Sequence, residues 1–214
     1  MKEGIVVIGG GGHAKSVIDA LCSRCPNKQI AIIDNELPKG TKLLEYSVFG
    51  TDDCLSELYK SGYIEAVIAV GSIKTTRVRR NIYSKIKNIG YSFPIISDKS
   101  STVAQSAMVS EGVFVGKNAV VNSEAKIGKF GIINTGAIIE HDCQIGDFTH
   151  ISVGAIISGN CSIGEDVFVG ANSTIIQGVK VGMNCVIGAG SVVLADVPDN
   201  TQVVGVWKNS TIYS

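Results

Sequence analysis

Apolar residues recur at every sixth position over the second half of the chain. From Thr102 to Val197 the sequence divides into sixteen consecutive hexads without an insertion, and the second residue of every hexad is Val or Ile. The sixth residue is always Ala, Gly, Cys, Ser, Thr or Val. A period of six is too short for a helical repeat but fits a short strand followed by a turn. The pattern predicts a parallel β-helix with three hexads in each coil.

Glycine is frequent at the third position of these hexads, and we expect it there to permit turn dihedrals that other residues avoid. A β-sandwich of short strands is the alternative fold for this segment. We disfavour it because sandwich strands vary in length and are separated by irregular turns. The third-position glycines are Gly116, Gly128, Gly146, Gly164, Gly170, Gly182 and Gly188.

The first half of the chain has the pattern of an α/β domain. An apolar run at 5–8 ends in four glycines, residues 14–23 have helical spacing of apolar side chains, and a second apolar run at 30–33 ends at Asp34. These segments predict a βαβ unit. A third strand at 66–70 and a basic amphipathic helix at about 75–89 follow. The sequence thus predicts a Rossmann-like α/β domain over residues 1–97 and an all-β domain over residues 98–214.

Charge and composition narrow the partners of the chain. It has 19 basic and 19 acidic residues in 214 and no Lys/Arg-rich run, so it lacks the electrostatic basis for binding nucleic acid or a membrane surface. No export signal or membrane-spanning run is apparent, and we expect a cytoplasmic protein whose six cysteines are reduced. Cys22 and Cys25 form a C-x-x-C without a second pair or a nearby His, so we expect no metal site.

The glycine run after the first strand suggests phosphate chemistry. A glycine-rich turn between a strand and a helix lets backbone N–H groups approach a phosphate without a collision with a β-carbon. Gly9 and Gly11 with Ala14 at the third position fit a variant of the dinucleotide fingerprint, and Asp34 is placed to accept a ribose hydroxyl. The domain is too small for a full dinucleotide fold. The pattern therefore favours one nucleotide over two.

Three segments together resemble one family. They are Ile-Gly-Gly-Gly-Gly-His-Ala-Lys at 8–15, Ile-Asp-Asn at 33–35 and Ile-Asn-Thr-Gly-Ala-Ile-Ile-Glu-His-Asp-Cys at 133–143. The chain is similar over nearly its whole length to hexapeptide-repeat sugar O/N-acetyltransferases, which act on sialic acids or nucleotide-linked amino sugars. The resemblance implies a left-handed β-helix, a homotrimer and acetyl-CoA as co-substrate, with no metal.

The resemblance also implies roles for individual residues. His141 would be the general base, and Asp142 the carboxylate that raises its basicity. Acetyl-CoA would contact Asn134 and His150 and, through its pantetheine arm, the backbone of Ala171 and Ala189. The phosphates of the sugar nucleotide would bind at Gly11, Gly12 and His13, and the rest of the nucleotide at Asp34, Asn35 and Gly71.

An independent physical argument supports His141. Acetyl transfer from a thioester needs a base of near-neutral pKa to take a proton from the attacking amine or hydroxyl, and imidazole has that pKa. His141 is the fourth residue of its hexad and so points away from the apolar ladder. His150 lies half a coil further along the chain, which places the two side chains on different walls. We therefore expect a site shared between subunits.

The chain departs from the family pattern at two places. Ser97-Asp98 stands where the family commonly has His-Pro, and Val206-Trp207-Lys208 follows Gly205 where the family has Gly-x-Pro-Ala. The second change bears on how the adenosine end of CoA is held.

We expect an acetyl-CoA-dependent N-acetyltransferase for a nucleotide-linked amino sugar, serving surface-glycan biosynthesis. The alternatives are a sialic acid O-acetyltransferase, a non-catalytic trimeric scaffold of a glycan pathway and, on the glycine loop alone, a nicotinamide oxidoreductase.

Overall fold

The computed structural model describes residues 4–72 and 75–208, which form two compact units. The first unit contains residues 4–72 and 76–99, and the second contains Thr75 and residues 100–208. The chain thus passes from one unit to the other at residues 99–100, just after the predicted boundary. Within the described ranges, none of the helices has the length and apolar character needed to cross a bilayer.

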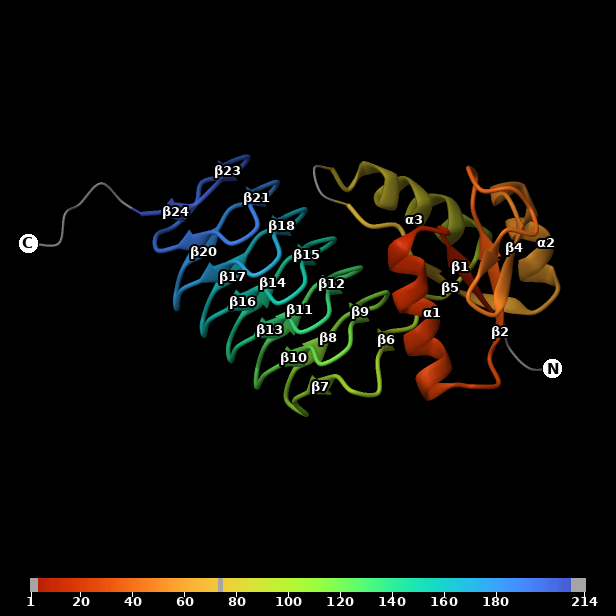
Figure 1. Cartoon of the computed structure of the whole chain (residues 1–214), viewed down its shortest axis with the longest axis horizontal. Helices are drawn as coiled ribbons and strands as arrows, with labels where there is room; N and C mark the ends of the chain where they lie inside the picture. The colour runs from red at the N-terminus through yellow and green to blue at the C-terminus, as the bar shows by residue number, and fades with distance from the viewer. Residues whose placement is uncertain (1–3, 73–74, 209–214) are drawn as a thin grey trace, which may run out of the picture. The chain divides into compact units, whose positions relative to one another are not determined.

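The first unit is an α/β fold on a five-stranded sheet with the order β3-β4-β2-β1-β5 (Figure 1). All neighbours are parallel except β3 and β4, which form an antiparallel hairpin. Every residue of β1 is buried because this strand is paired on both sides, with β2 and with β5. The strands are β1 (Gly4–Ile8), β2 (Gln29–Ile33), β3 (Lys42–Leu43), β4 (Tyr46–Gly50) and β5 (Tyr63–Ile68).

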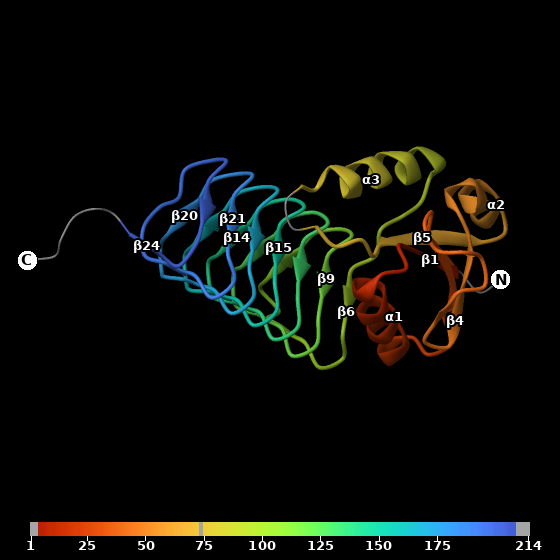
Figure 2. The ribbon, with the colours of Figure 1, turned by 45° about the horizontal axis from the view of Figure 1, so that its top comes forward.

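Helices cover both faces of this sheet, with α1 on one side and α3 on the other (Figures 1 and 2). The helix α1 (Gly12–Arg24) buries Val17, Ile18 and Leu21, as the apolar spacing predicts. The other helical segments are η1 (Asp52–Cys54), α2 (Leu55–Lys60) and α3 (Arg77–Ile89). The last strand of the unit, β6 (Ile96–Ser97), is tied to α1 because Nε of Arg24 donates to the carbonyl oxygen of Ser97 at 2.7 Å.

The second unit is the expected left-handed parallel β-helix with three walls, each made of two-residue strands from successive coils (Figure 2). The first wall consists of β7 (Thr102–Val103), β10 (Val120–Val121), β13 (Ile138–Ile139), β16 (Ile156–Ile157), β19 (Thr174–Ile175), β22 (Val192–Val193) and β24 (Val206–Trp207). The second wall consists of β8 (Met108–Val109), β11 (Lys126–Ile127), β14 (Gln144–Ile145), β17 (Ser162–Ile163) and β20 (Lys180–Val181). The strands of the second unit in the third wall are β9 (Phe114–Val115), β12 (Ile132–Ile133), β15 (His150–Ile151), β18 (Phe168–Val169), β21 (Val186–Ile187) and β23 (Gln202–Val203).

The register between coils is constant at three hexads. Val121 pairs with Ile139, and Ile139 pairs with Ile157. Each second-position side chain therefore lies above the equivalent one of the previous coil, and all of them from Val115 to Val193 are at most 3% exposed. These apolar ladders form the core of the unit.

The corners between walls use the fifth hexad position, which corrects one expectation from the sequence. The fifth residue has positive φ in fourteen successive hexads, from Gly112 to Gly190, and nine of these residues are not glycine. Asn, Asp and Gly, which tolerate this conformation best, fill most of these positions. The third-position glycines have no positive φ. The expectation that they supply turn dihedrals is wrong.

The third-position glycines instead permit close stacking of coils. A β-carbon built at Gly146 would lie 2.5 Å from the backbone nitrogen of Glu165 in the next coil, and one at Gly164 would lie 2.7 Å from that of Met183. Both neighbours are backbone atoms and cannot rotate away. Glycine is therefore found at these third positions because the backbone of the next coil lies too close to leave room for a β-carbon.

This distinction predicts different effects on stability for substitutions at a third-position and a fifth-position glycine. Gly146→Ala should lower the free energy of unfolding by about 1–3 kcal/mol because its methyl group meets the next coil. Gly136→Asn should change it by less than about 0.5 kcal/mol. Position 136 has a φ of 66° and open space around the β-carbon, and Asn fills the equivalent fifth position in other hexads. Thermal or urea unfolding measures both, and an equal loss in the two variants would contradict the stacking account.

Candidate functional site

The glycine loop of the first unit lies at the carboxyl edge of the parallel sheet, between β1 and α1. The strand order reverses at β1, since β2 and β4 lie on one side of it and β5 on the other. Ligands of open α/β sheets bind at such a switch point. Gly11 and Gly12 stand at the N-terminus of α1, where the first helical N–H groups have no intrahelical acceptor. A β-carbon at either residue would meet no atom within 4 Å, so this backbone is open to a ligand.

Asp34 holds the glycine loop in place. Its Oδ2 accepts the backbone N–H of Gly10 at 2.6 Å, and its Oδ1 accepts those of Glu36 and Leu37 at 2.8 Å. Burial raises the pKa of this carboxyl, but the three backbone donors outweigh it and lower the pKa below its ordinary value. Asp34 is thus an ionised support of the loop, in addition to the nucleotide contact expected from the sequence.

The other residues expected at the nucleotide lie at the same edge. His13 is the second residue of α1, and Asn35 follows Asp34 after β2. Oδ1 of Asn35 accepts the backbone N–H of Asp52 at 3.0 Å, which leaves its amide group for other contacts. Gly71 is exposed in the segment after β5. The fold therefore gathers all the candidates of the first unit at the ends of β1, β2 and β5.

His141 and Asp142 form a hydrogen-bonded pair in the second unit, at the corner that follows β13. Nδ1 of His141 lies 2.8 Å from Oδ2 of Asp142. Both side chains are more than half exposed, so the pair is open to solvent. The hydrogen bond to Asp142 raises the pKa of His141. Desolvation opposes this shift, but the charges of Asp142 and Glu140 also raise the pKa, which lies above its ordinary value.

Neighbouring residues fix the backbone and ring of His141. Oε2 of Glu140 accepts the backbone N–H of His141 at 3.3 Å, and Oε1 of Glu140 accepts Nδ2 of Asn122 at 3.0 Å. Asn122 lies one coil before Glu140, and Gly159 lies one coil after His141, against its ring. The sequence argument assigned no role to Asn122 or Gly159. Their offsets of three hexads from Glu140 and His141 are the signal that identifies them.

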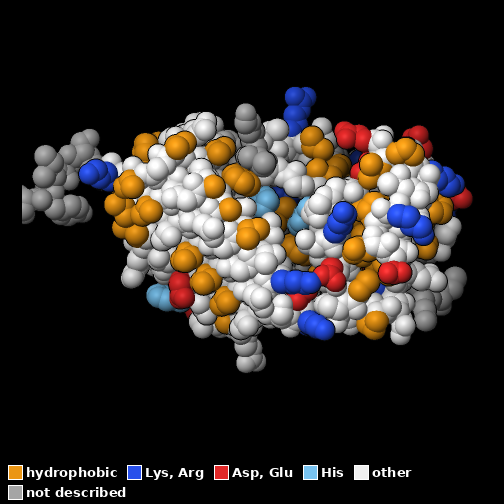
Figure 3. All heavy atoms as spheres, in the orientation of Figure 1, with side chains coloured by type: hydrophobic (Ala, Val, Ile, Leu, Met, Phe, Trp, Pro, Cys, Tyr) orange, Lys and Arg blue, Asp and Glu red, His pale blue; other side chains and the backbone are white. Residues whose placement is uncertain are grey.

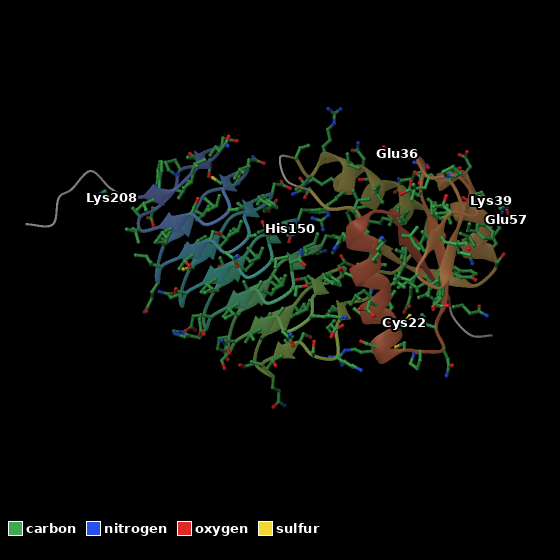
Figure 4. All side chains as sticks on the ribbon, in the orientation of Figure 1. Cys22, Glu36, Lys39, Glu57, His150 and Lys208 are labelled. Atoms are coloured by element: carbon green, nitrogen blue, oxygen red, sulfur yellow. The ribbon has the colours of Figure 1, made fainter. Side chains whose placement is uncertain are left out.

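His150 occupies the third wall, on β15 (Figure 4). It is 9% exposed and packs edge-to-face on Phe168, with ring centroids 5.2 Å apart. Its Nε2 lies 3.2 Å from Nδ2 of Asn134, whose Oδ1 accepts the backbone N–H of Thr135. Nε2 of His150 is then the acceptor, since the amide oxygen is already engaged. Asn134 and His150 are a contacting pair.

The two backbone candidates for the pantetheine arm, Ala171 and Ala189, lie one coil apart at the corner after the third wall. They are stacked, because the carbonyl oxygen of Ala171 accepts the backbone N–H of Gly190. Within one chain the structure thus brings Asn134, His150, Ala171 and Ala189 to the third wall and its corner. His141 and Asp142 lie at the corner after the first wall.

Cys143 follows this pair but cannot act as an exposed nucleophile. Its side chain is fully buried, and its thiol donates to the carbonyl oxygen of Ser158 at 3.1 Å. A hydrogen bond with Cys161 and burial both raise the pKa of this thiol. All six cysteines are free thiols. In residues 4–72 and 75–208, no three His, Cys, Asp or Glu side chains gather to form a metal-binding group.

Comparisons with known proteins find a matching family model for each of the two units. The family model of the PglD N-terminal domain matches residues 4–86, and that of the hexapeptide repeat of succinyl-transferase matches residues 160–195. No curated protein sequence matches the chain.

Solved structures of sugar acetyltransferases match almost the whole chain. A His-to-Ala variant of GDP-perosamine N-acetyltransferase from Caulobacter crescentus, in complex with CoA and GDP-perosamine, is 34% identical with a TM-score of 0.87 and covers 96% of this chain and 95% of its own. The acetyltransferase domain of PglB from Neisseria gonorrhoeae FA1090, in complex with acetyl coenzyme A, is 32% identical with a TM-score of 0.88 and covers 96% of this chain and 97% of its own.

A more distant match is WeeI from Acinetobacter baumannii AYE, which is 26% identical with a TM-score of 0.85 over 95% of this chain and 97% of its own. From the two units, the hexad repeat and these whole-length matches, the chain belongs to the hexapeptide-repeat family of acetyl-CoA-dependent sugar acetyltransferases.

Proposed function

We propose that this protein transfers the acetyl group of acetyl-CoA to the amino nitrogen of a nucleotide-linked amino sugar, with His141 as the general base. The observation that carries the proposal is the exposed His141–Asp142 pair at 2.8 Å. An ionised Asp142 only accepts hydrogen bonds, so Nδ1 of His141 carries the proton toward it. Nε2 then keeps a lone pair for the substrate.

In the proposed reaction the amino nitrogen attacks the thioester carbonyl carbon directly. A C–N bond forms, Nε2 of His141 takes the proton from the nitrogen, and the tetrahedral intermediate collapses with cleavage of the C–S bond. The departing sulfur receives the proton from His141, which restores the base and releases CoA. Burial of Cys143 supports direct transfer over a route through an acyl-cysteine.

The glycine loop supports a nucleotide-bearing acceptor. Gly11, Gly12 and His13 would hold its phosphates at the N-terminus of α1, whose partial positive charge favours anions. Asp34, Asn35 and Gly71 would contact the rest of the nucleotide. Asn134, His150, Ala171 and Ala189 would hold acetyl-CoA on the third wall. The homologous enzyme from Caulobacter crescentus contains CoA together with GDP-perosamine, a nucleotide sugar.

An acceptor panel tests this function. The protein is mixed with acetyl-CoA and with UDP-, GDP- and CMP-linked amino sugars or free sialic acids, while free CoA thiol and product mass are followed. We expect CoA release with at least one nucleotide-linked amino sugar and an acetyl group on its nitrogen. An O-acetylated sialic acid as product would overturn the assigned acceptor, and no release with any acceptor would favour the scaffold function.

We further propose a homotrimer in which each site draws on two subunits. His141 and His150 lie on different walls of one chain, so a neighbouring copy is needed to bring an equivalent pair together. Exposed apolar side chains on and beside the first wall, including Ile156, Ile176 and Leu194, are suited to such an interface. Figure 3 shows that the visible surface of the β-helix carries many apolar and few charged side chains.

Replacement of the base gives the first prediction for the reaction. His141→Ala should lower turnover by ~10²–10⁴, the usual effect of removing a general base. The side chain is exposed, so the melting temperature should stay within about 2 °C of that of the unmodified protein. Steady-state kinetics and thermal unfolding measure the two quantities. Unchanged turnover would refute the assignment.

The pH dependence of the reaction follows from the raised pKa of His141. The base acts in its neutral form, so kcat/KM should fall as the pH drops through this pKa. Asp142→Asn removes the hydrogen bond to a carboxylate and its charge, which lowers the pKa and moves the acidic limb of the profile to lower pH. The plateau rate should fall less than in His141→Ala. An acidic limb that stays in place would contradict the pairing.

Site sharing predicts complementation between two inactive variants. His141→Ala and His150→Ala subunits, co-expressed with different tags and purified as mixed oligomers, should regain activity because some interfaces then combine an intact His141 with an intact His150. Homogeneous variants serve as controls. Mixed oligomers no more active than the two parents, or a fully active monomer in analytical ultracentrifugation, would contradict a shared site.

A further inference from the structure

Gly159 lies directly against the imidazole of His141, one coil further along the β-helix. Both residues occupy the fourth position of their hexads. A β-carbon built at Gly159 would lie 2.6 Å from Nε2, 2.7 Å from Cε1 and 3.2 Å from Cδ2 of His141. Real β-carbons essentially never approach a heavy atom closer than 3.0 Å. The ring therefore occupies space that exists only because residue 159 has no side chain.

The backbone at Gly159 does not itself demand glycine. Its φ is not in the left-handed region, unlike that of the fifth-position residues. Other residues of the same column, in the fourth hexad position after the first wall, carry side chains: Gln105, Ser123, Gln177 and Ala195. A side chain is compatible with this position wherever the previous coil lacks the histidine ring.

The same contact bears on the hydrogen bond between His141 and Asp142. The ring is held by this bond at Nδ1 and lies over Gly159 on the side of Nε2. A substituent at residue 159 pushes on Nε2 and Cε1, and rotation of the ring away from it moves Nδ1 relative to Asp142. Asp142 thus holds the imidazole at Nδ1, and the absence of a side chain at Gly159 leaves room for Nε2 and Cε1.

We propose that Gly159 is a positioning residue for the reaction, and that its missing side chain keeps the His141 imidazole bonded to Asp142 with Nε2 free beside the coil. This inference rests on the proposed role of His141 as general base. Gly159 acts through His141, so any substitution that adds a β-carbon should cost activity without loss of the fold. The effect should disappear when the imidazole is absent.

The test compares Gly159→Ala with Gln177→Ala, which changes the exposed residue at the same position of the next coil. Gly159→Ala should lower kcat by about tenfold or more, but by no more than the ~10²–10⁴ expected for complete loss of the general base. Gln177→Ala should leave kcat unchanged. The methyl group of Gly159→Ala meets the exposed end of the His141 side chain, which can rotate, and Gln177 is itself exposed. Both variants should therefore have the melting temperature of the unmodified protein. In the His141→Ala background, Gly159→Ala should cause no further loss of kcat.

A second measurement is independent of activity. The chain has three histidines, so NMR resonances of His141 are assigned by comparison with His141→Ala, and its pKa is read by titration. Gly159→Ala should lower the pKa of His141 toward the ordinary imidazole value because the bond to Asp142 is weakened. Asp142→Asn should do the same, and Gln177→Ala should not.

The outcomes separate this inference from the proposed function. An unchanged pKa and an unchanged kcat in Gly159→Ala overturn the positioning role. A large loss of kcat that persists in the His141→Ala background also overturns it, because Gly159 would then act on the substrate and not through the ring. If His141→Ala keeps full activity while Gly159→Ala still lowers the pKa of His141, the proposed function fails and the ring contact stands.

Discussion

The backbone hydrogen bonds between coils, at a constant spacing of three hexads, are the interaction on which the rest of this structure depends. The N–H of Glu140 donates to the carbonyl oxygen of Ile157, and that of Gly146 donates to the carbonyl oxygen of Ile163 in the same way. This register stacks the Val and Ile ladders and leaves no room for a side chain at Gly146. It also places each outward-pointing side chain between the equivalent residues of the coil before and the coil after.

The candidate base depends on the same register. Asp142 is the left-handed corner residue of its hexad, with a φ of 60°, so the corner fixes the backbone of the His141–Asp142 pair. In the stacked coils, Asn122 of the coil before donates a hydrogen bond to Glu140. Gly159 of the coil after lies against the ring of His141. The imidazole thereby gains a defined orientation while it stays exposed to solvent. Burial would instead lower its pKa. Preorganisation of this kind is what general base catalysis requires.

The sequence predicts much of this because a strict hexad fixes both the strand period and the outward position of His141. The β1–α1–β2 unit is predicted for a similar reason, since apolar runs and glycines mark its ends. The hairpin of β3 and β4 and the short helix α2 escape prediction, because such short elements lack a clear period. The role of the third-position glycines was misjudged because contact between coils is not local in sequence. The support given by Asp34 to Gly10 is hidden for the same reason.

A crystal structure of the protein with CoA and a nucleotide-linked amino sugar tests the central claim most directly. The account predicts that the amino nitrogen of the sugar lies about 2.6–3.2 Å from Nε2 of His141, the range for proton transfer to a general base. Nδ1 should remain on Asp142 and the ring should rest on Gly159. An amino nitrogen that contacts another base, with His141 turned away from the sugar, would contradict the account.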